Sequence, residues 1–243
     1  MNKLFGFLFT PIHYLFFFLL LLIFHVVQVI AFNFFGEKAH KRSVDLLNFF
    51  LLQNFRTIGT RIKFIINYSL PVGQTIIAIS NHQSMYDMPM IIWYLRKINL
   101  KFVSKKELAK GIPSISYNLR HSGAALIDRN DKAQALAEIE KLGKLIQEKK
   151  LSALIFPEGT RSKTGILKPF SIGGISTLLR EAPDALILPL VINNSWKIFR
   201  YGQFPLSFGE KISLEVLEPF SSKNLTALEV IAKAEEQIKG KLK

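Results

Sequence analysis

The feature that most constrains this chain is an uncharged, strongly apolar segment near its start. Residues 4–36 contain no Asp, Glu, Lys or Arg, and 13 of the 21 phenylalanines fall within residues 1–56. About 20 apolar residues are enough to span a bilayer as a helix, so this segment is long enough to do so. We expect a helix over residues 11–35 that starts at Pro11, where a missing backbone N–H costs little.

Two alternative interpretations of this segment fit the sequence less well. A cleaved signal peptide has a shorter apolar core, and no small-x-small cleavage site follows the segment. A buried core helix needs a domain large enough to hide it, and 243 residues leave little room for that. We therefore interpret the segment as membrane-associated. Whether it crosses the bilayer or only embeds in it stays open.

A second, amphipathic helix is expected after a charged hinge at residues 37–42. Apolar side chains then recur at spacings of three and four, which marks one face of a helix. They are Leu47, Phe50, Leu51, Phe55, Ile58 and Ile62. Residues 1–65 are thus expected to form a membrane-docking helical pair.

The distribution of basic residues predicts the side of the membrane. Most of those near the helical pair follow the first helix: Lys38, Lys41, Arg42, Arg56, Arg61 and Lys63. The positive-inside tendency therefore places the rest of the protein on the cytoplasmic face of the inner or cell membrane.

The overall composition narrows the classes of partner. The chain has 32 Lys and Arg against 18 Asp and Glu, a net charge of +14. Such a surface favours anionic partners, whether lipid headgroups, phosphorylated substrates, nucleic acid or acidic proteins. The absence of cysteine excludes disulfides, thiolate metal sites and Cys nucleophiles.

Residues 66–243 are expected to form one α/β domain. Short apolar runs predict strands at 75–80, 100–104, 124–127, 151–156, 186–191 and 212–216. Mixed segments predict helices at 88–97, 131–149, 171–181 and 224–239. Asn130 or Asp131 can cap the second of these, and Thr226 with Glu229 has capping-box spacing at the last. This alternation favours a mostly parallel sheet covered by helices.

Polar clusters follow two of the expected strands, at "NHQSMYD" (81–87) and "PEGTRS" (157–162). Ligands on parallel sheets bind beyond the carboxyl ends of strands. A histidine there can take a proton from a hydroxyl, and a carboxylate that fixes its tautomer makes it a better base. His82 and Asp87 form such a pair if a helix begins at Asp87, which leaves Pro89 in the first turn. The alternative is that Asp87 only caps the helix and His82 is an ordinary loop residue.

The second cluster is suited to binding an anion. Gly159 allows close backbone approach, Thr160 supplies a hydroxyl, and Arg161 offers a planar fork for phosphate. The alternative is a surface turn in which Glu158 and Arg161 form a solvated ion pair. The sequence has no known phosphate-loop or hydrolase motif and no convincing nucleophile beside the histidine. A base without an enzyme nucleophile suggests direct activation of a substrate hydroxyl.

Together these motifs resemble the glycerolipid acyltransferase family, in particular its bacterial 1-acylglycerol-3-phosphate acyltransferases. "NHQSMYD" and "FPEGTRS" lie about 70 residues apart and are similar to the first and third family motifs. "FVSKKEL" (102–108) with "GAALIDR" (123–129) resembles the second, and "LILPLVI" (186–192) the fourth. The resemblance covers roughly residues 70–217, and the N-terminal helical pair resembles the membrane-docking element of the family.

The resemblance implies a reaction and two catalytic residues. His82 would take the proton from the sn-2 hydroxyl of lysophosphatidic acid, and Asp87 would orient His82. The hydroxyl oxygen would attack an acyl thioester directly, which gives phosphatidic acid without an acyl-enzyme. By analogy with other acyl transfers, backbone amides near the His82 turn would stabilise the oxyanion.

The resemblance also implies a substrate-binding set. Arg161 and Lys105 would bind the phosphate of the acceptor, with Arg129 as a further candidate. Residues 158–160 (Glu158, Gly159 and Thr160) would shape the acceptor site. In the alternative interpretation Lys105 belongs to a solvated charge run, and Arg129 pairs with Asp128 or Asp131.

The expected partners are a lysophospholipid acceptor, an acyl-CoA or acyl carrier protein donor, and a membrane. No metal or bound cofactor and no nucleic acid is expected; the oligomeric state is left open. Two other functions fit part of the sequence. One is acyl transfer to a different lysophospholipid or to an aminolipid. The other is a non-catalytic basic module that binds a membrane surface or nucleic acid, although no nucleic-acid-binding motif occurs.

Overall fold

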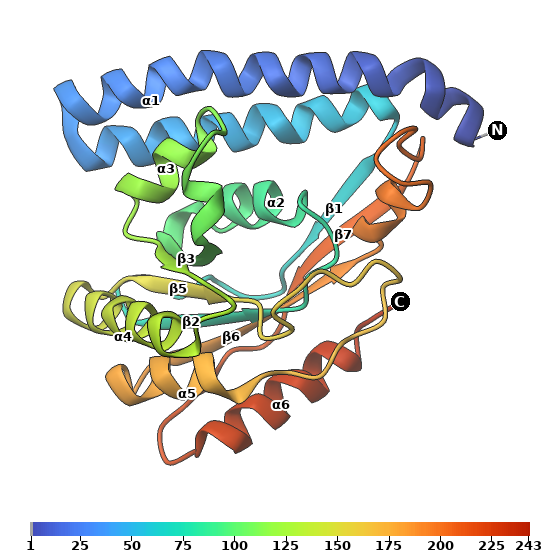
Figure 1. The fold of residues 1–243 in the computed structure, drawn as a ribbon. Coiled ribbons are helices and arrows are strands. Elements are labelled where there is room, and N and C mark those ends of the chain that lie inside the picture. The colour runs from blue at the N-terminus through green and yellow to red at the C-terminus, as the bar shows by residue number, and fades with distance from the viewer. Residues whose placement is uncertain (1) are drawn as a thin grey trace.

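A helical hairpin lies along one side of an eight-stranded sheet in the computed structural model, which describes residues 2–243 (Figure 1). The hairpin is α1 (Asn2–Asn54), which turns back on itself at Gly36. Helices α2 (Asp87–Tyr94) and α3 (Ile115–His121) lie between the hairpin and the sheet. The opposite face of the sheet is covered by α4 (Lys132–Lys149), α5 (Ile172–Glu181) and α6 (Ala227–Lys239).

The sheet is mostly parallel, which confirms the fold class predicted from the sequence. Its strand order is β1-β7-β6-β2-β5-β3-β4, and β8 pairs with β6. Strands β2 to β6 all run in one direction, whereas β7 and β8 are antiparallel to β6. The strands are β1 (Arg61–Ile65), β2 (Ile76–Ser80), β3 (Leu100–Lys105), β4 (Ala125–Ile127), β5 (Ser152–Ile155), β6 (Leu186–Asn193), β7 (Lys211–Val216) and β8 (Phe220–Ser221). The carboxyl ends of five neighbouring parallel strands therefore meet at one edge.

Short 3-10 helices complete the elements: η1 (Phe55–Ile58), η2 (Arg96–Ile98), η3 (Lys106–Ala109) and η4 (Ser195–Phe199). The six predicted strands and four predicted helices are confirmed to within a few residues. Asp131 caps α4 by accepting a hydrogen bond from the Gln134 amide, and Thr226 and Glu229 form the predicted capping box of α6. Strands β1 and β8 and helix α3 were not predicted.

The prediction that the first helix starts at Pro11 is wrong, because α1 already begins at Asn2. Contacts with the loop before β7 hold this extra helical stretch in place. Thr10 Oγ1 accepts a hydrogen bond of 2.9 Å from the Leu206 amide, and Gly6 packs directly against the Leu206 backbone. Tertiary contacts thus continue the helix on the N-terminal side of the proline.

The predicted course of the second helix also needs correction. The charged segment 37–42 is helical, and the reversal occurs at Gly36 alone. The helix does not reach Ile62. It ends at Asn54 and is followed by η1, and Gly59 then takes a left-handed conformation with φ 63°. The chain next enters β1, which pairs in parallel with β7, so Ile62 is a strand residue.

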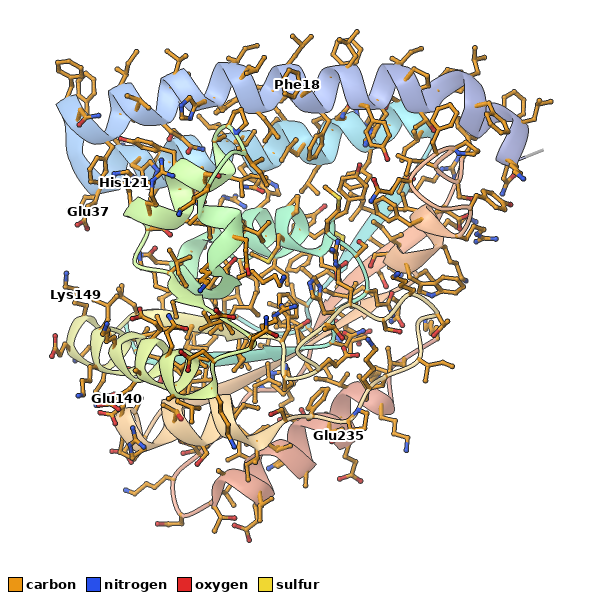
Figure 2. The ribbon with its side chains drawn as sticks, viewed as in Figure 1. Phe18, Glu37, His121, Glu140, Lys149 and Glu235 are labelled. Atoms are coloured by element: carbon orange, nitrogen blue, oxygen red, sulfur yellow. The ribbon has the colours of Figure 1, made fainter. Side chains whose placement is uncertain are left out.

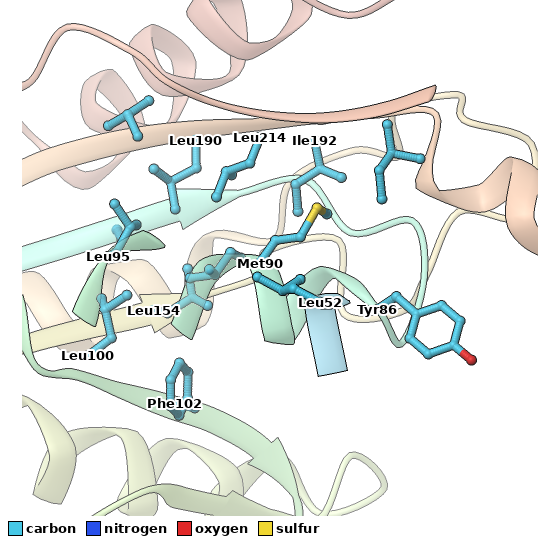
Figure 3. Packing of buried hydrophobic residues seen from close by; sticks show 14 of the residues in the cluster. Leu52, Tyr86, Met90, Leu95, Leu100, Phe102, Leu154, Leu190, Ile192 and Leu214 are labelled. Atoms are coloured by element: carbon cyan, nitrogen blue, oxygen red, sulfur yellow. The ribbon is translucent and has the colours of Figure 1, made fainter. Parts of the chain in front are cut away.

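Two apolar layers hold the sheet between its helices. Successive residues of β2 alternate between them, with Ile76 and Ala78 facing the hairpin side and Ile77 and Ile79 facing α4, α5 and α6. Figure 3 shows the hairpin-side layer, in which α2 packs on β5, β6 and β7; its members include Leu52, Tyr86, Met90, Leu154, Leu190, Ile192 and Leu214. Burial on both faces explains why β2 is a continuous apolar run.

The side of α1 turned away from the sheet is apolar and uncovered (Figure 2). By length and composition this helix is able to cross a membrane. Its exposed side chains include Leu4, Leu8, Leu15, Phe18, Ile23 and Val26. An exposed apolar surface of this size is typical of proteins that bind other surfaces, including membranes.

The hairpin turn yields a stability prediction. Gly36 has φ 75° and ψ −172°, a region that is almost restricted to glycine. A Cβ there would meet nothing within 4 Å, so Gly36→Ala adds backbone strain without a clash. We expect it to lower the free energy of unfolding by about 1–3 kcal/mol, measured by chemical denaturation in mild detergent. Gly240→Ala is the control, because Gly240 has a helical φ of −65°. Equal small effects of the two changes would contradict the strain.

Candidate active site

Polar loops from three adjacent strands meet at the carboxyl edge of the sheet. His82 follows β2, the segment 156–162 follows β5, and Ser195 follows β6; β5 and β6 are the two neighbours of β2. The predicted placement of the two sequence motifs at one edge is therefore confirmed. Asn81 begins the turn, since its side chain exchanges two hydrogen bonds of 2.8 Å with the backbone of Ile192.

His82 and Asp87 are in direct contact. His82 Nδ1 lies 2.8 Å from Asp87 Oδ2, and the Asp87 side chain is completely buried. Helix α2 begins at Asp87, which puts Pro89 in its first turn as the sequence predicted. Tyr86 is the N-cap of this helix and makes no side-chain capping bond. The Asp87 carboxylate is instead directed back at the loop that carries the histidine.

Asp87 satisfies its buried carboxylate with five hydrogen bonds. Oδ2 accepts from His82 Nδ1 and from the backbone amides of Gln83 (2.7 Å) and Ser84 (2.9 Å). Oδ1 accepts from the hydroxyls of Ser84 (3.1 Å) and Ser195 (2.5 Å). A buried carboxylate needs such partners to be tolerated, and here they also fix its position.

This arrangement sets the tautomer of the histidine. Because Nδ1 faces an acceptor-only carboxylate, it carries the proton in the neutral ring, and Nε2 keeps its lone pair. Nε2 has no hydrogen-bond partner within residues 2–243, and 14% of the side chain is exposed. Phe156 stacks on the imidazole with the ring centroids 4.0 Å apart, which restricts its rotation. The geometry thus leaves one ring nitrogen, Nε2, with an unused lone pair.

Glu158 joins the two motifs through its carboxylate. Oε1 accepts from the His82 amide at 2.7 Å, and Oε2 accepts from the Lys168 amide at 3.0 Å. The Ser162 amide donates to the His82 carbonyl at 2.7 Å, which adds a third link between these loops. Burial raises the pKa of the Glu158 carboxyl group, while the two amide hydrogen bonds lower it. Glu158 therefore holds the loop that carries His82.

Basic residues end or follow three strands on one side of β2, namely β5, β3 and β4. Arg161 follows β5, Lys105 ends β3, and Arg129 follows β4. Burial and the nearby charge of Arg161 both lower the pKa of Arg129, which is expected where guanidinium groups face a common site. Lys105 is exposed and lies 3.9 Å from Glu107.

The alternative pairing of Arg129 with a neighbouring carboxylate is not observed. Asp128 instead binds Lys106 at 2.6 Å, and Arg129 forms no ion pair with any residue that the structure describes. Gly159 has φ 68° and open space where a Cβ would lie. Thr160 Oγ1 accepts a hydrogen bond of 2.8 Å from Lys168 Nζ, which also donates to the Arg161 carbonyl.

Several site residues were not found from the sequence. Ser195 contacts Asp87 although the two lie 108 residues apart in the sequence. Phe156 belongs to a motif but was assigned no role, and Lys168 lies outside both motifs. The amides near the histidine turn were expected to stabilise an oxyanion. Those of His82, Gln83 and Ser84 already donate to carboxylates, so that expectation is wrong for these three. Within residues 2–243 no group of three His, Asp or Glu side chains is arranged to hold a metal ion.

Comparison with known proteins covers the region that contains this site. The acyltransferase family model matches residues 61–193, which include all of the site residues except Ser195. The chain belongs to the acyltransferase family. A 1-acyl-sn-glycerol-3-phosphate acyltransferase of Helicobacter pylori is 32% identical over 177 residues, covering 70% of this chain and 68% of the relative. One of Limnanthes douglasii is 33% identical over 152 residues, covering 62% of this chain and 52% of that protein.

The shared fold extends beyond the family match. The crystal structure of the 1-acyl-sn-glycerophosphate (LPA) acyltransferase PlsC from Thermotoga maritima superposes with a TM-score of 0.79. The match covers 99% of this chain and 95% of that one, at 22% sequence identity. The fold therefore includes the hairpin as well as the sheet. The chain spans about half the length of several curated relatives it matches.

The link between the two motifs in this member of the family can be tested through stability. Glu158→Gln keeps one oxygen that accepts a backbone amide but replaces the other with an NH2 group. This group would face the second backbone N–H and cannot accept from it. We expect it to lower the free energy of unfolding by about 1–3 kcal/mol, measured by chemical denaturation. Glu148→Gln, at an exposed position of α4, is the control and should change stability little. A change at Glu158 no larger than the control would show that the two amide contacts do not form.

Proposed function

We propose that this chain transfers an acyl group from a thioester to the sn-2 hydroxyl of lysophosphatidic acid, giving phosphatidic acid for phospholipid synthesis. The observation that carries the proposal is the His82–Asp87 pair, in which Nε2 has no hydrogen-bond partner among residues 2–243. Family membership and the names of the relatives support the same reaction. Another lysophospholipid or an aminolipid as acceptor would use the same base but would not need the cations.

In the proposed reaction His82 acts on the acceptor directly. Nε2 takes the proton of the sn-2 hydroxyl as its oxygen attacks the thioester carbonyl carbon. Asp87 holds Nδ1–H and stabilises the imidazolium that forms. The tetrahedral intermediate then collapses, the C–S bond breaks, and the imidazolium returns its proton to the departing thiolate. The products are the ester and the free thiol, and no acyl-enzyme is needed.

The phosphate of the acceptor would lie on the β5 side of the base. Arg161, Lys105 and Arg129 offer donors that pair well with a phosphate. The open space at Gly159 lets a ligand approach the backbone, and the Thr160 hydroxyl is available next to it. In this proposal Glu158 shapes the acceptor site by holding its loops, since both carboxylate oxygens accept backbone amides.

The net charge suggests the class of acyl donor, and the hairpin suggests how the protein binds the membrane. A net charge of +14 suits acyl-CoA or an acidic acyl carrier protein, both of which are anionic. The exposed apolar side of α1 would embed in the membrane, so that the acyl tail of the acceptor stays in the bilayer while its headgroup reaches the site. The basic residues after the first half of α1 would keep the site on the cytoplasmic face.

Removal of the base gives the most direct test of the mechanism. We expect His82→Ala to lower kcat by about 10²–10⁴-fold, because the base is lost. The variant should still fold, because Asp87 keeps its other four hydrogen bonds. The assay follows phosphatidic acid formed from lysophosphatidic acid and an acyl thioester in mild detergent. His121→Ala, on α3, is the matched control. Activity within a few-fold of the wild type in His82→Ala would rule out the assigned base.

The cation set predicts how acceptors are distinguished. Arg161→Ala should raise the apparent KM for lysophosphatidic acid about tenfold or more, because a charge-assisted contact to phosphate is lost. The KM for a neutral lysolipid should change much less. Lys163→Ala removes an exposed charge from the same loop and serves as the control. Equal effects of Arg161→Ala on both acceptors would argue against contact between Arg161 and the phosphate.

A further inference from the structure

A pocket lies apart from the candidate active site, where the hairpin meets the edge of the sheet. Its volume is about 900 Å³. It is formed by the end of α1, the η1–β1 turn, the end of α2 and the start of β7. Its lining comprises Leu52, Gln53, Arg56, Gly59, Thr60, Arg61, Ile62, Tyr94, Phe208, Gly209 and Lys211. None of these residues belongs to the catalytic or acceptor-binding set.

The charge of this pocket is entirely positive. Arg56, Arg61 and Lys211 line it, and no Asp, Glu or His is among the lining residues. None of the three cations forms an ion pair with any carboxylate in residues 2–243. The nearest carboxylate in the sequence, Glu210, is bound to the Ser207 hydroxyl at 2.6 Å and to Arg200 at 2.8 Å. The pocket therefore has three cations without a counter-charge from the protein.

Two of these cations lie side by side on neighbouring strands of the sheet. Arg61 and Lys211 are register partners in the parallel pair of β1 and β7, and both are exposed. Like charges at facing positions of neighbouring strands repel and destabilise the pair. An uncharged side chain at either exposed position would avoid this repulsion and make the strand pair more stable. A bound anion would turn this repulsion into attraction.

A buried hydroxyl at the same pocket also lacks a partner. The Thr60 residue is 4% exposed, and its Oγ1 has no hydrogen-bond partner among the residues described. A buried polar atom left unpaired costs about 1–3 kcal/mol, so such atoms are rare without a ligand or water. Because Thr60 is one of the lining residues, an anion held by the three cations would lie next to the residue that carries this hydroxyl.

The wall of the pocket continues into the apolar surface of α1. Phe208 lines the pocket, and its ring packs on Phe5 and Phe9 with centroids 5.4 and 5.2 Å apart. Leu4 and Leu8, on the same helical stretch, are 73% and 62% exposed. Figure 1 shows β1 and β7 running side by side from beneath this end of the hairpin. A ligand in the pocket is thus next to the surface assigned to the membrane.

We propose that Arg56, Arg61 and Lys211 bind the phosphate of an anionic membrane phospholipid at this second site, with the Thr60 hydroxyl as a further donor. Arginine pairs with phosphate through two parallel hydrogen bonds, and basic residues near a bilayer are attracted to anionic lipids. The adjacent apolar helix favours a lipid over a free phosphate, because the acyl chains of a lipid can remain in the bilayer. The site would hold the protein in one orientation on the membrane.

Vesicle binding tests the proposal with a matched pair of double variants. Arg61→Gln with Lys211→Gln removes two charges from the pocket. Lys38→Gln with Arg42→Gln removes two exposed charges after the hairpin turn, which also lies beside the apolar surface. Sedimentation is measured with vesicles of phosphatidylcholine alone and of phosphatidylcholine with phosphatidylglycerol. We expect the pocket variant to lose at least about tenfold in affinity for the anionic vesicles only, and the control to lose much less.

Two results would overturn the proposal. Equal losses in the two double variants would show diffuse attraction to the membrane rather than a site. No loss in the pocket variant would show that these cations do not bind lipid. Titration of the protein with glycerol 3-phosphate in the absence of vesicles distinguishes a soluble phosphate from a lipid headgroup. Binding as tight as that of the anionic vesicles would assign the site to a soluble anion instead.

Thermal stability gives a readout that does not depend on sedimentation. Without anionic lipid, Lys211→Gln should leave the melting temperature unchanged or slightly raised, because it removes the repulsion with Arg61. Anionic lipid in mild detergent should raise the melting temperature of the wild type and not that of the variant. The same rise in both proteins would contradict the site. Neither measurement uses acyl transfer, so failure here is distinguishable from failure of the proposed function.

Discussion

The buried carboxylate of Asp87 is the constraint on which the rest of the site depends. A fully buried charge persists only when its lone pairs are used, and Asp87 takes donors from the loop after β2 and from Ser195 after β6. The same contacts set the start of α2 and the orientation of His82. One interaction thus connects strand pairing, a helix terminus and the availability of a basic nitrogen.

The hairpin is connected to this site as well as to the outer surface. His13, in the first half of α1, contacts the Asn54 carbonyl at the end of the second half through Nδ1. Its Nε2 therefore accepts from the Tyr86 hydroxyl at 2.8 Å, and Tyr86 directly precedes Asp87. A single buried histidine joins both halves of the hairpin to the first turn of α2. The apolar surface and the candidate base are accordingly parts of one packed unit.

Local patterns in the sequence predicted the elements and the motif residues, whereas contacts between distant segments were missed. Alternating apolar runs and helix caps predicted the parallel sheet and its helices. Because ligands bind beyond the carboxyl ends of parallel strands, the segments around His82 and Glu158 were expected at one edge. The start of α1 was missed because contacts with residues 204–208 extend it past Pro11. Ser195 was missed because a serine carries no local signal, and only the pairing of β6 with β2 brings it to Asp87.

The most direct test of the account is the tautomer of His82 in the resting protein. Nitrogen-15 NMR of histidine-labelled protein distinguishes protonated from unprotonated ring nitrogens at a pH where the imidazole is neutral. We predict a proton on Nδ1 and none on Nε2, with the preference weakened in Asp87→Asn. A proton on Nε2 in the wild type would contradict it, because that nitrogen could not then accept a proton from a substrate hydroxyl.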